Sequence, residues 1–227
     1  MLEAVDRDLW VADGPAVPFF GFPYPTRAAL VRLRDGALWV WSPIRLDQQL
    51  ARAVDGLGPV HHLVAPNKLH HLFLGEWQAR WPAARLWAPP GLRPRRPDLQ
   101  FDGDLGDAPD PAWAEDIDQV VFRGSVAMEE VVFLHRGSRT ALVADLIQRF
   151  DPSAVRGWRG RVMRLDGLVG DDGSTPREWR LTFWRRGPAR RAKARVLAWD
   201  PQRVIVAHGD WARSRGREVI ERGLRWL

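Results

Sequence analysis

The chain has 227 residues, 45% of them hydrophobic, so it is long enough for one sizeable core and suits a single domain better than two. It contains no cysteine, which excludes disulfides, thiolate nucleophiles and thiolate metal ligands. A metal site would therefore need His, Asp or Glu. Because we find neither an apolar run of about eighteen residues nor a basic leader before an apolar stretch, we expect a cytoplasmic protein without a membrane span.

The formal net charge of +6 at pH 7 makes only a weak case for nucleic acid as a partner. Lys68 and Lys193 are the only lysines among 34 basic residues, and such an excess of arginine is typical of a bias in coding. Net charge informs solubility and non-specific association before it informs specific function. The same bias makes Lys68 conspicuous where it stands.

The first hundred residues predict an antiparallel opening followed by alternating strands and helices. The turn Arg34-Asp35-Gly36 joins two short apolar runs into a hairpin. Gly58-Pro59 closes a helical pattern, and Pro66-Asn67 ends a buried strand before a second helical pattern begins. The expected strands are residues 8–13, 28–33, 37–41, 60–65 and 85–88, and the expected helices are 46–57 and 69–81.

The second half predicts a further block of antiparallel strands and two more helices. Residues 89–118 hold six prolines and predict a long irregular excursion, which we expect to form a rim over the site. Residues 150–195 are rich in arginine, and their apolar stripe indicates a core-facing helix with a solvated basic face. The expected strands are residues 117–122, 130–135, 140–146 and 204–207, and the expected helices are 188–199 and 216–227.

Three of these strands lead directly to polar residues that are able to bind a metal. The strand at 60–65 leads to His70 and His71, that at 140–146 contains Asp145, and that at 204–207 precedes His208. The ends of neighbouring strands converge on one crevice in a layered α/β protein, so these side chains are expected to meet. Histidine and aspartate together suit Zn²⁺, with Mn²⁺ or Fe as alternatives.

Four segments carry a resemblance to a known family. They read FPYPTRAALVRLRDGALWVWSPI, LVAPNKLHHLFLGEW, EVVFLHRGSRTALVADL and VIVAHGD. The chain resembles the metallo-β-lactamase superfamily, and most closely a branch of it known as domain of unknown function 4336 (DUF4336). The resemblance implies a metal-dependent hydrolase fold, a four-layer αββα sandwich, formed as a single domain over residues 1–227.

The resemblance also implies that one of the two usual metal positions is lost. The superfamily reads H-x-H-x-D-H at the turn that is Pro66-Asn67-Lys68-Leu69-His70-His71 here. Pro66 and Lys68 stand where two histidines of the first metal would be, and Ser42 replaces an aspartate. The third ligand of that metal would fall near residues 128–130, where Glu129 or Glu130 is an alternative oxygen donor.

The second metal position is implied to survive. His71 matches the final histidine of the motif, His70 replaces its aspartate, Asp145 matches the bridging aspartate and His208 the late histidine. The ammonium of Lys68 would neutralise Asp145 in place of the lost ion, because opposite charges within about 4–6 Å favour the ionised carboxylate. One metal is still able to lower the pKa of its water.

The sequence leaves three functions open. The first is a mononuclear hydrolase of an ester, phosphoester or lactone, in which His70, His71, Asp145 and His208 bind the metal and Lys68 or Asn67 orients an anionic or carbonyl group. The second is a metal-free protein that binds a small anion or serves as a scaffold. Here the histidines only pack or satisfy a backbone carbonyl, and Asp145 only pairs with Lys68. The third is nucleic-acid processing by the basic segment. No G-x-S-x-G sequence supports a serine hydrolase, and the oligomeric state stays open.

Overall fold

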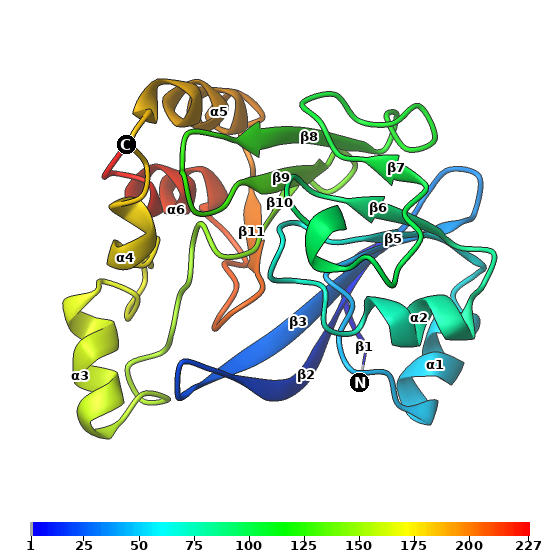
Figure 1. Ribbon diagram of the computed structural model, residues 1–227, viewed down its shortest axis with the longest axis horizontal. Coiled ribbons are helices and arrows are strands. Elements are labelled where there is room, and N and C mark those ends of the chain that lie inside the picture. Colours follow the sequence, from blue (N-terminus) through cyan, green and yellow to red (C-terminus); the bar gives the residue numbers. More distant parts are fainter. Residues whose placement is uncertain (1) are drawn as a thin grey trace.

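Two β-sheets lie face to face in the molecule, and helices cover their outer faces (Figure 1). The computed structural model describes residues 2–227. The first sheet has the order β1 (Leu2–Asp6), β2 (Leu9–Phe19), β3 (Phe22–Arg32), β4 (Leu38–Trp41), β5 (Val60–Val64), β6 (Arg85–Ala88) and β7 (Gly103–Asp104). The second has the order β11 (Arg203–Val206), β10 (Thr140–Val143), β9 (Glu130–His135) and β8 (Ile117–Phe122).

Four of the helices form the two outer layers. The α-helices are α1 (Gln48–Asp55), α2 (Leu74–Arg80), α3 (Gly157–Leu165), α4 (Arg177–Arg180), α5 (Arg186–Ala198) and α6 (Gly216–Gly223), and η1 (Arg93–Arg95) is a short 3₁₀ helix. Apolar residues of α1 and α2 pack on the first sheet, and those of α5 and α6 pack on the second. The architecture is therefore the expected αββα sandwich.

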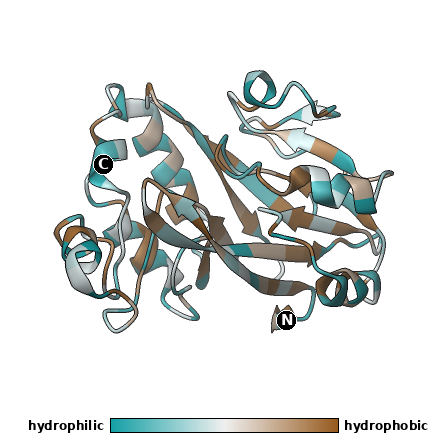
Figure 2. Cartoon of the chain, turned by 60° about the horizontal axis from the view of Figure 1, so that its bottom comes forward, coloured by the Kyte–Doolittle hydropathy of each residue, from teal (hydrophilic) through white to brown (hydrophobic). Residues whose placement is uncertain are grey.

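Alternation along the strands builds the core. Trp39 and Trp41 of β4 point into the layer between the sheets, whereas Leu38 and Val40 point toward α1 and α2. This is the period of two that a strand buried on both faces requires. Figure 2 shows hydrophobic residues concentrated along the strands between the two helical layers. No helix within residues 2–227 is long and apolar enough to cross a membrane.

Chain direction decides which ends of the strands meet. β4 to β7 run parallel, with α1 and α2 in the connections, and β10 runs parallel to β11. The carboxyl ends of parallel strands lie at the same edge of a sheet. The residues that follow β5, β10 and β11 therefore gather at one edge of the sandwich.

Several expected elements have the observed bounds, and others differ. The strands at 85–88, 117–122 and 130–135 are confirmed exactly. The helix expected from Leu69 begins only at Leu74, because Oδ1 of Asn67 accepts the N–H of Leu69 (2.8 Å) and starts a separate turn. The weak patterns of β1, α3 and α4 gave no expectation of these elements, and the excursion at 89–118 contains η1 and β7.

Candidate metal centre

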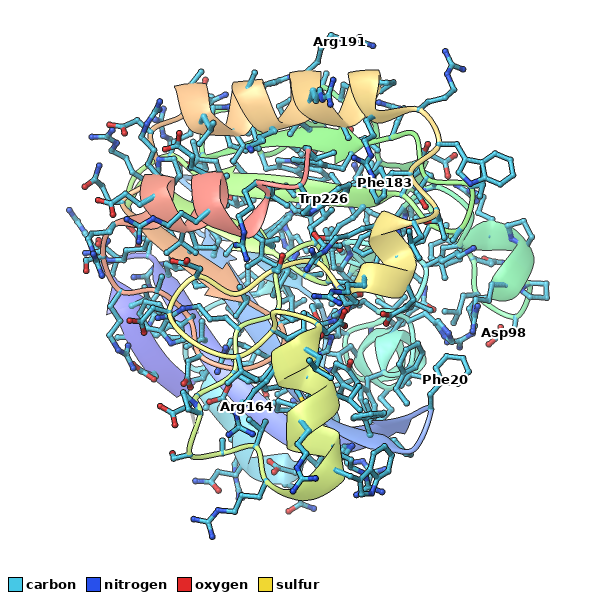
Figure 3. The ribbon with its side chains drawn as sticks, turned by 90° about the vertical axis from the view of Figure 1, so that its left-hand side faces the viewer. Phe20, Asp98, Arg164, Phe183, Arg191 and Trp226 are labelled. Carbon is cyan, nitrogen blue, oxygen red and sulfur yellow. The ribbon has the colours of Figure 1, made fainter. Side chains whose placement is uncertain are left out.

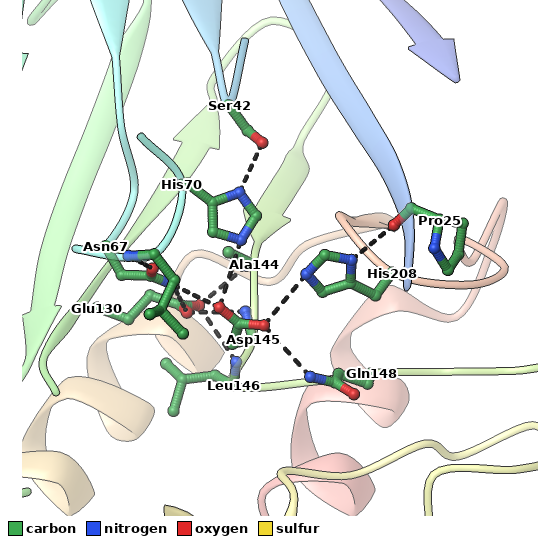
Figure 4. A network of polar contacts seen from close by, with 11 residues as sticks. Pro25, Ser42, Asn67, His70, Glu130, Ala144, Asp145, Leu146, Gln148 and His208 are labelled. Atoms are coloured by element: carbon green, nitrogen blue, oxygen red, sulfur yellow. Dashed lines mark hydrogen bonds and ion pairs between the residues drawn. The ribbon is translucent and has the colours of Figure 1, made fainter. Parts of the chain in front are cut away.

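Three side chains from three strand ends meet at the edge of the sandwich (Figure 4). Nε2 of His70 lies 3.3 Å from Oδ2 of Asp145, and Nε2 of His208 lies 3.2 Å from Oδ1 of the same carboxylate. One ligand atom from each residue lies within 4.8 Å of the other two. Asp145 and His208 are buried and His70 is half-buried. The sequence prediction that these three residues converge is confirmed.

A hydrogen bond fixes the orientation of the His208 ring and places a hydrogen on its Nδ1. Its Nδ1 lies 2.7 Å from the backbone oxygen of Pro25, and because a carbonyl only accepts, Nδ1 must donate. In neutral His208, Nε2 then carries a lone pair that faces the carboxylate of Asp145. Two acceptors at 3.2 Å repel each other unless a proton or a cation lies between them.

His70 is held in the same manner from the first sheet. Its Nδ1 lies 2.7 Å from Oγ of Ser42, which directly follows β4. Ser42 adopts a left-handed backbone (φ 51°), so the residue turns at the strand end and presents its hydroxyl to the ring. Trp41 stacks near the same imidazole, with ring centroids 6.3 Å apart. Ser42, which stands where the metallo-β-lactamase superfamily has an aspartate, thus orients the ring of His70 here.

Two amide side chains complete the hydrogen bonds of Asp145. Nδ2 of Asn67 donates to Oδ2 (2.8 Å), and Nε2 of Gln148 donates to Oδ1 (3.2 Å). Burial raises the pKa of Asp145, but its close contacts with the side chains of His208 and His70 outweigh burial and hold this pKa well below its usual value. The carboxylate is therefore ionised and fixed in direction.

Glu130 supports the turn that carries Asp145. Its fully buried carboxylate accepts the backbone N–H groups of Ala144 (2.9 Å), Asp145 (2.8 Å) and Leu146 (3.3 Å), and also Nδ2 of Asn67 (2.9 Å). Burial and then the charge of Asp145 raise the pKa of Glu130, against the opposite effect of these donors. Both oxygens are occupied by N–H donors, so Glu130 holds the turn and is not placed as a metal ligand.

His71, expected as a ligand, lies outside the centre. Its Nε2 accepts from Nε of Arg95 (3.2 Å), and Nη1 of Arg96 donates to its backbone oxygen (2.7 Å). Burial, followed by the charges of Arg95 and Arg96, lowers the pKa of His71, so its ring is neutral. The added turn at Asn67 directs His70 to Asp145 and His71 to the arginines.

Lys68 forms no ion pair with Asp145 within residues 2–227. The ion-pair contacts of Asp145 are with His70 and His208, and the stem of Lys68 runs beside Gly91. The pairing of Lys68 with Asp145 that we expected is therefore not found. The neutral amide of Asn67 occupies that side of the carboxylate and bridges it to Glu130.

The three centre residues line a cavity of about 190 Å³ that is walled mainly by apolar side chains. The β2–β3 hairpin and the turn before α2 supply most of the walls. The lining residues include Val17, Pro18, Phe19, Tyr24, Pro43, Leu72 and Phe73, with Arg95 and His71 also on the wall. A small molecule that enters the cavity therefore reaches His70, Asp145 and His208 directly.

The donor set fits one divalent ion. His70 and His208 contact different oxygens of the Asp145 carboxylate, at 3.3 and 3.2 Å, and one ligand atom from each of the three residues lies within 4.8 Å of the others. Each histidine has its other ring nitrogen engaged, by Ser42 or by Pro25, as metal-binding histidines do. Two imidazoles and one carboxylate suit zinc, and manganese or iron as alternatives.

Four contributing residues were not predicted from the sequence to contact the centre. Pro25 acts through its backbone oxygen, and Ser42, Gln148 and Arg95 are common polar types in positions that only the fold connects to the centre. The departure at Ser42 from the family motif marked that residue as unusual, without indicating its contact with His70. His135 and His62 lie apart, bonded to Ser138 and Trp87.

Comparisons with known structures agree with the overall fold. A metallo-β-lactamase from Pontibacter korlensis superposes with a TM-score of 0.64 at 11% identity, covering 100% of this chain and 97% of that one. The metallo-β-lactamase FIM-1 from Pseudomonas aeruginosa in its mono-zinc form superposes with a TM-score of 0.64 at 14% identity, and the match covers 100% of this chain and 93% of that one. A metallo-β-lactamase from Erythrobacter litoralis with β-mercaptoethanol in the active site superposes with a TM-score of 0.67 at 14% identity. This match covers 99% of this chain and 94% of that one.

No curated protein matches the chain by sequence. The family model described as "Domain of unknown function (DUF4336)" matches residues 19–156, which is more than half of the chain. That segment contains β3 to β10 and two of the three centre residues, His70 and Asp145. The chain therefore belongs to the DUF4336 family and has the fold of the metallo-β-lactamases.

Proposed function

We propose that the protein is a mononuclear metal-dependent hydrolase of a small ester, phosphoester or lactone. One observation carries the proposal. Nδ1 of His208 is committed as a donor to Pro25, so in neutral His208 the lone pair on Nε2 faces the carboxylate of Asp145 at 3.2 Å. A divalent ion held by His70, Asp145 and His208 turns that repulsion into coordination by three ligands.

When bound, a divalent ion supplies Lewis acidity, which polarises a carbonyl or phosphoryl oxygen and lowers the pKa of water. The residues of the chain orient the metal ligands and shape the cavity around them. Asn67 and Gln148 hold the Asp145 carboxylate in one direction, while Ser42 and the Pro25 carbonyl fix the two imidazole rings. The apolar cavity walls exclude bulk water from a substrate in contact with this centre.

The relatives of known structure support a centre with one ion. FIM-1 has the same fold and has been observed in a mono-zinc form. In this chain Pro66 and Lys68 remove two donors from one position, while three donors meet at the other. The proposal therefore needs one ion and no second one.

Metal content tests the proposal directly. Protein purified without a nickel column is expected to contain close to one equivalent of a transition metal, or to take up one equivalent of Zn²⁺ or Mn²⁺ with a rise in Tm, because an ion that binds only the folded state stabilises it. Asp145→Asn is the matched variant, since it keeps the shape of the side chain and removes its charge. Less than about 0.1 equivalent of metal, with no thermal shift on adding either ion, would refute the proposal.

A metal-free anion-binding protein is the second candidate. The observation in its favour is that Asn67 and Gln148 already satisfy Asp145, and two protonated histidines would complete the centre without an ion. In that case the Asp145→Asn variant is expected to lose stability without any difference in metal content. Titration of the histidine ring resonances by NMR in protein as purified, without a chelator, separates the two candidates, because only the second one needs both rings to be charged.

A further inference from the structure

The strongest unassigned feature of the cavity is the guanidinium of Arg95. The short helix η1 and the residue after it carry three arginines: Arg93, Arg95 and Arg96. Arg93 pairs with Asp104 (2.7 Å), and Arg96 pairs with Asp98 (2.7 Å). Arg95 differs from both, since it lines the cavity that contains the candidate metal centre.

Arg95 is positioned by a neutral partner. Its Nε donates to Nε2 of His71 (3.2 Å), while Arg96 holds the backbone oxygen of the same histidine. Within the described part of the chain, no acidic side chain lies at ion-pair distance from Arg95, and its two Nη groups make no hydrogen bond. The planar fork with which arginine binds carboxylates is therefore available.

The surroundings of Arg95 decide what kind of molecule fits. Opposite η1, the β2–β3 hairpin contributes Val17, Pro18 and Phe19 to the cavity wall. Figure 3 shows Phe20, at the hairpin tip, and Asp98, just after η1, along the same edge of the molecule. A ligand at this edge thus meets apolar walls, one unpaired positive charge, and the His–Asp–His centre.

We propose that the cavity takes a small anionic substrate, an apolar body with a carboxylate or similar oxyanion that Arg95 binds bidentately. This inference rests on the proposed hydrolase and names its substrate class. The anion of the substrate lies on Arg95, its apolar part contacts the hairpin, and its ester or lactone group lies at His70, Asp145 and His208. His71 is a positioning residue, because it acts only through Arg95.

The test uses binding, so that it does not depend on turnover or on a metal. Protein treated with a chelator is titrated calorimetrically with 4-phenylbutyrate and with the neutral 4-phenylbutanamide, which has the same shape without the charge. The wild type is expected to bind the carboxylate at least about tenfold more tightly than the amide. Arg95→Gln is expected to remove that preference and to leave the affinity for the amide unchanged.

Arg93→Gln is the matched control, because it removes the same charge from the same turn but does not line the cavity. It is expected to keep the preference for the carboxylate. A wild type that binds neither probe, or an equal effect of the Arg93 and Arg95 variants, would overturn the inference. If the preference exists and depends on Arg95 while no metal is found, the substrate class stands and only the proposed hydrolysis fails.

With metal-loaded protein, a second readout applies to turnover. The probes are 4-nitrophenyl butyrate and the 4-nitrophenyl half-ester of glutarate, which differ by one terminal carboxylate. Arg95→Gln is expected to raise KM for the half-ester by at least about tenfold at unchanged kcat, and to leave both constants for the butyrate unchanged, because a contact made equally in the ground and transition states affects binding alone. A fall in kcat for both esters would contradict the assignment.

Discussion

His208 and Pro25 belong to different sheets, and a hydrogen bond of 2.7 Å joins them. The contact depends on how the His208 loop is held against β3. Arg27, also on β3, donates to the backbone oxygens of Val206 (2.8 Å) and Gly209 (2.7 Å), on either side of His208. The orientation of a candidate metal ligand is thus determined by a buried arginine on the opposite sheet.

Replacement of Arg27 by methionine is expected to lower the free energy of unfolding by about 3 kcal/mol, because two buried carbonyl groups lose a charged donor. Urea unfolding measures this change, and hydrogen exchange of residues 204–210 is expected to accelerate. Asp13→Asn is the control. Asp13 pairs with Arg27 but is 66% exposed, so its loss is expected to cost less than about 1 kcal/mol. Equal stability of the two variants would refute this role of Arg27.

The two adjacent histidines are expected to differ sharply in metal binding. His70→Ala removes a ligand and is expected to weaken zinc affinity by more than about 100-fold, since even outer partners of a metal site contribute about 10–100-fold. His71→Ala is expected to change it by less than about threefold, because its ring faces Arg95. Competition with a chromophoric chelator measures both constants. Similar losses in the two variants would show that the turn at Asn67 is incorrectly described.

Glu130→Gln is expected to destabilise the protein by about 3 kcal/mol. The carboxylate accepts four N–H groups, whereas the glutamine amide must direct its own NH₂ at one pair of them. For a chain of this size, the loss corresponds to a fall in Tm of about 6–12 °C in differential scanning calorimetry. Glu129→Gln, at a partly exposed neighbour, is expected to stay within about 1 kcal/mol of wild type. A neutral Glu130→Gln variant would show that the four bonds contribute little.

His62 makes stability depend on pH. Burial lowers its pKa to about 4, and Nδ1 accepts from Nε1 of Trp87 (3.1 Å), so the folded ring is neutral. Below about pH 6.5, His62 binds a proton in the unfolded chain but stays neutral in the folded chain. Stability therefore falls as the pH falls from about 6.5 to about 4. Between about pH 7 and about pH 5, wild type is expected to lose about 2 kcal/mol more than His62→Asn in urea unfolding. Parallel losses would contradict the assignment.

Much of the fold was predictable because its strands are buried on both faces and bounded by turn residues. β6, β8 and β9 have strong apolar runs between polar or proline-containing segments, and their bounds were predicted exactly. β1 was not predicted, because Leu2–Asp6 is short and none of its residues is fully buried. α3 was not predicted either, because its arginines are spread around the helix and few of its residues are buried.

The site was predictable as far as strand ends determine it. Asp145 and His208 directly follow two parallel neighbours, and chain direction alone brings them together. The choice between His70 and His71 depended on a hydrogen bond from the Leu69 N–H to the Asn67 side chain, which no periodicity reveals. The pairing of Lys68 with Asp145, which the structure does not show, was expected because we assumed that the motif kept its usual turn.

The centre draws its parts from both sheets: His70 and the Pro25 carbonyl from one, Asp145 and His208 from the other. A ligand that contacts all of them would tie the two halves of the sandwich together across their shared edge. Departure of that ligand would then ease separation of the halves, so the occupied protein should resist proteases longer than the empty one.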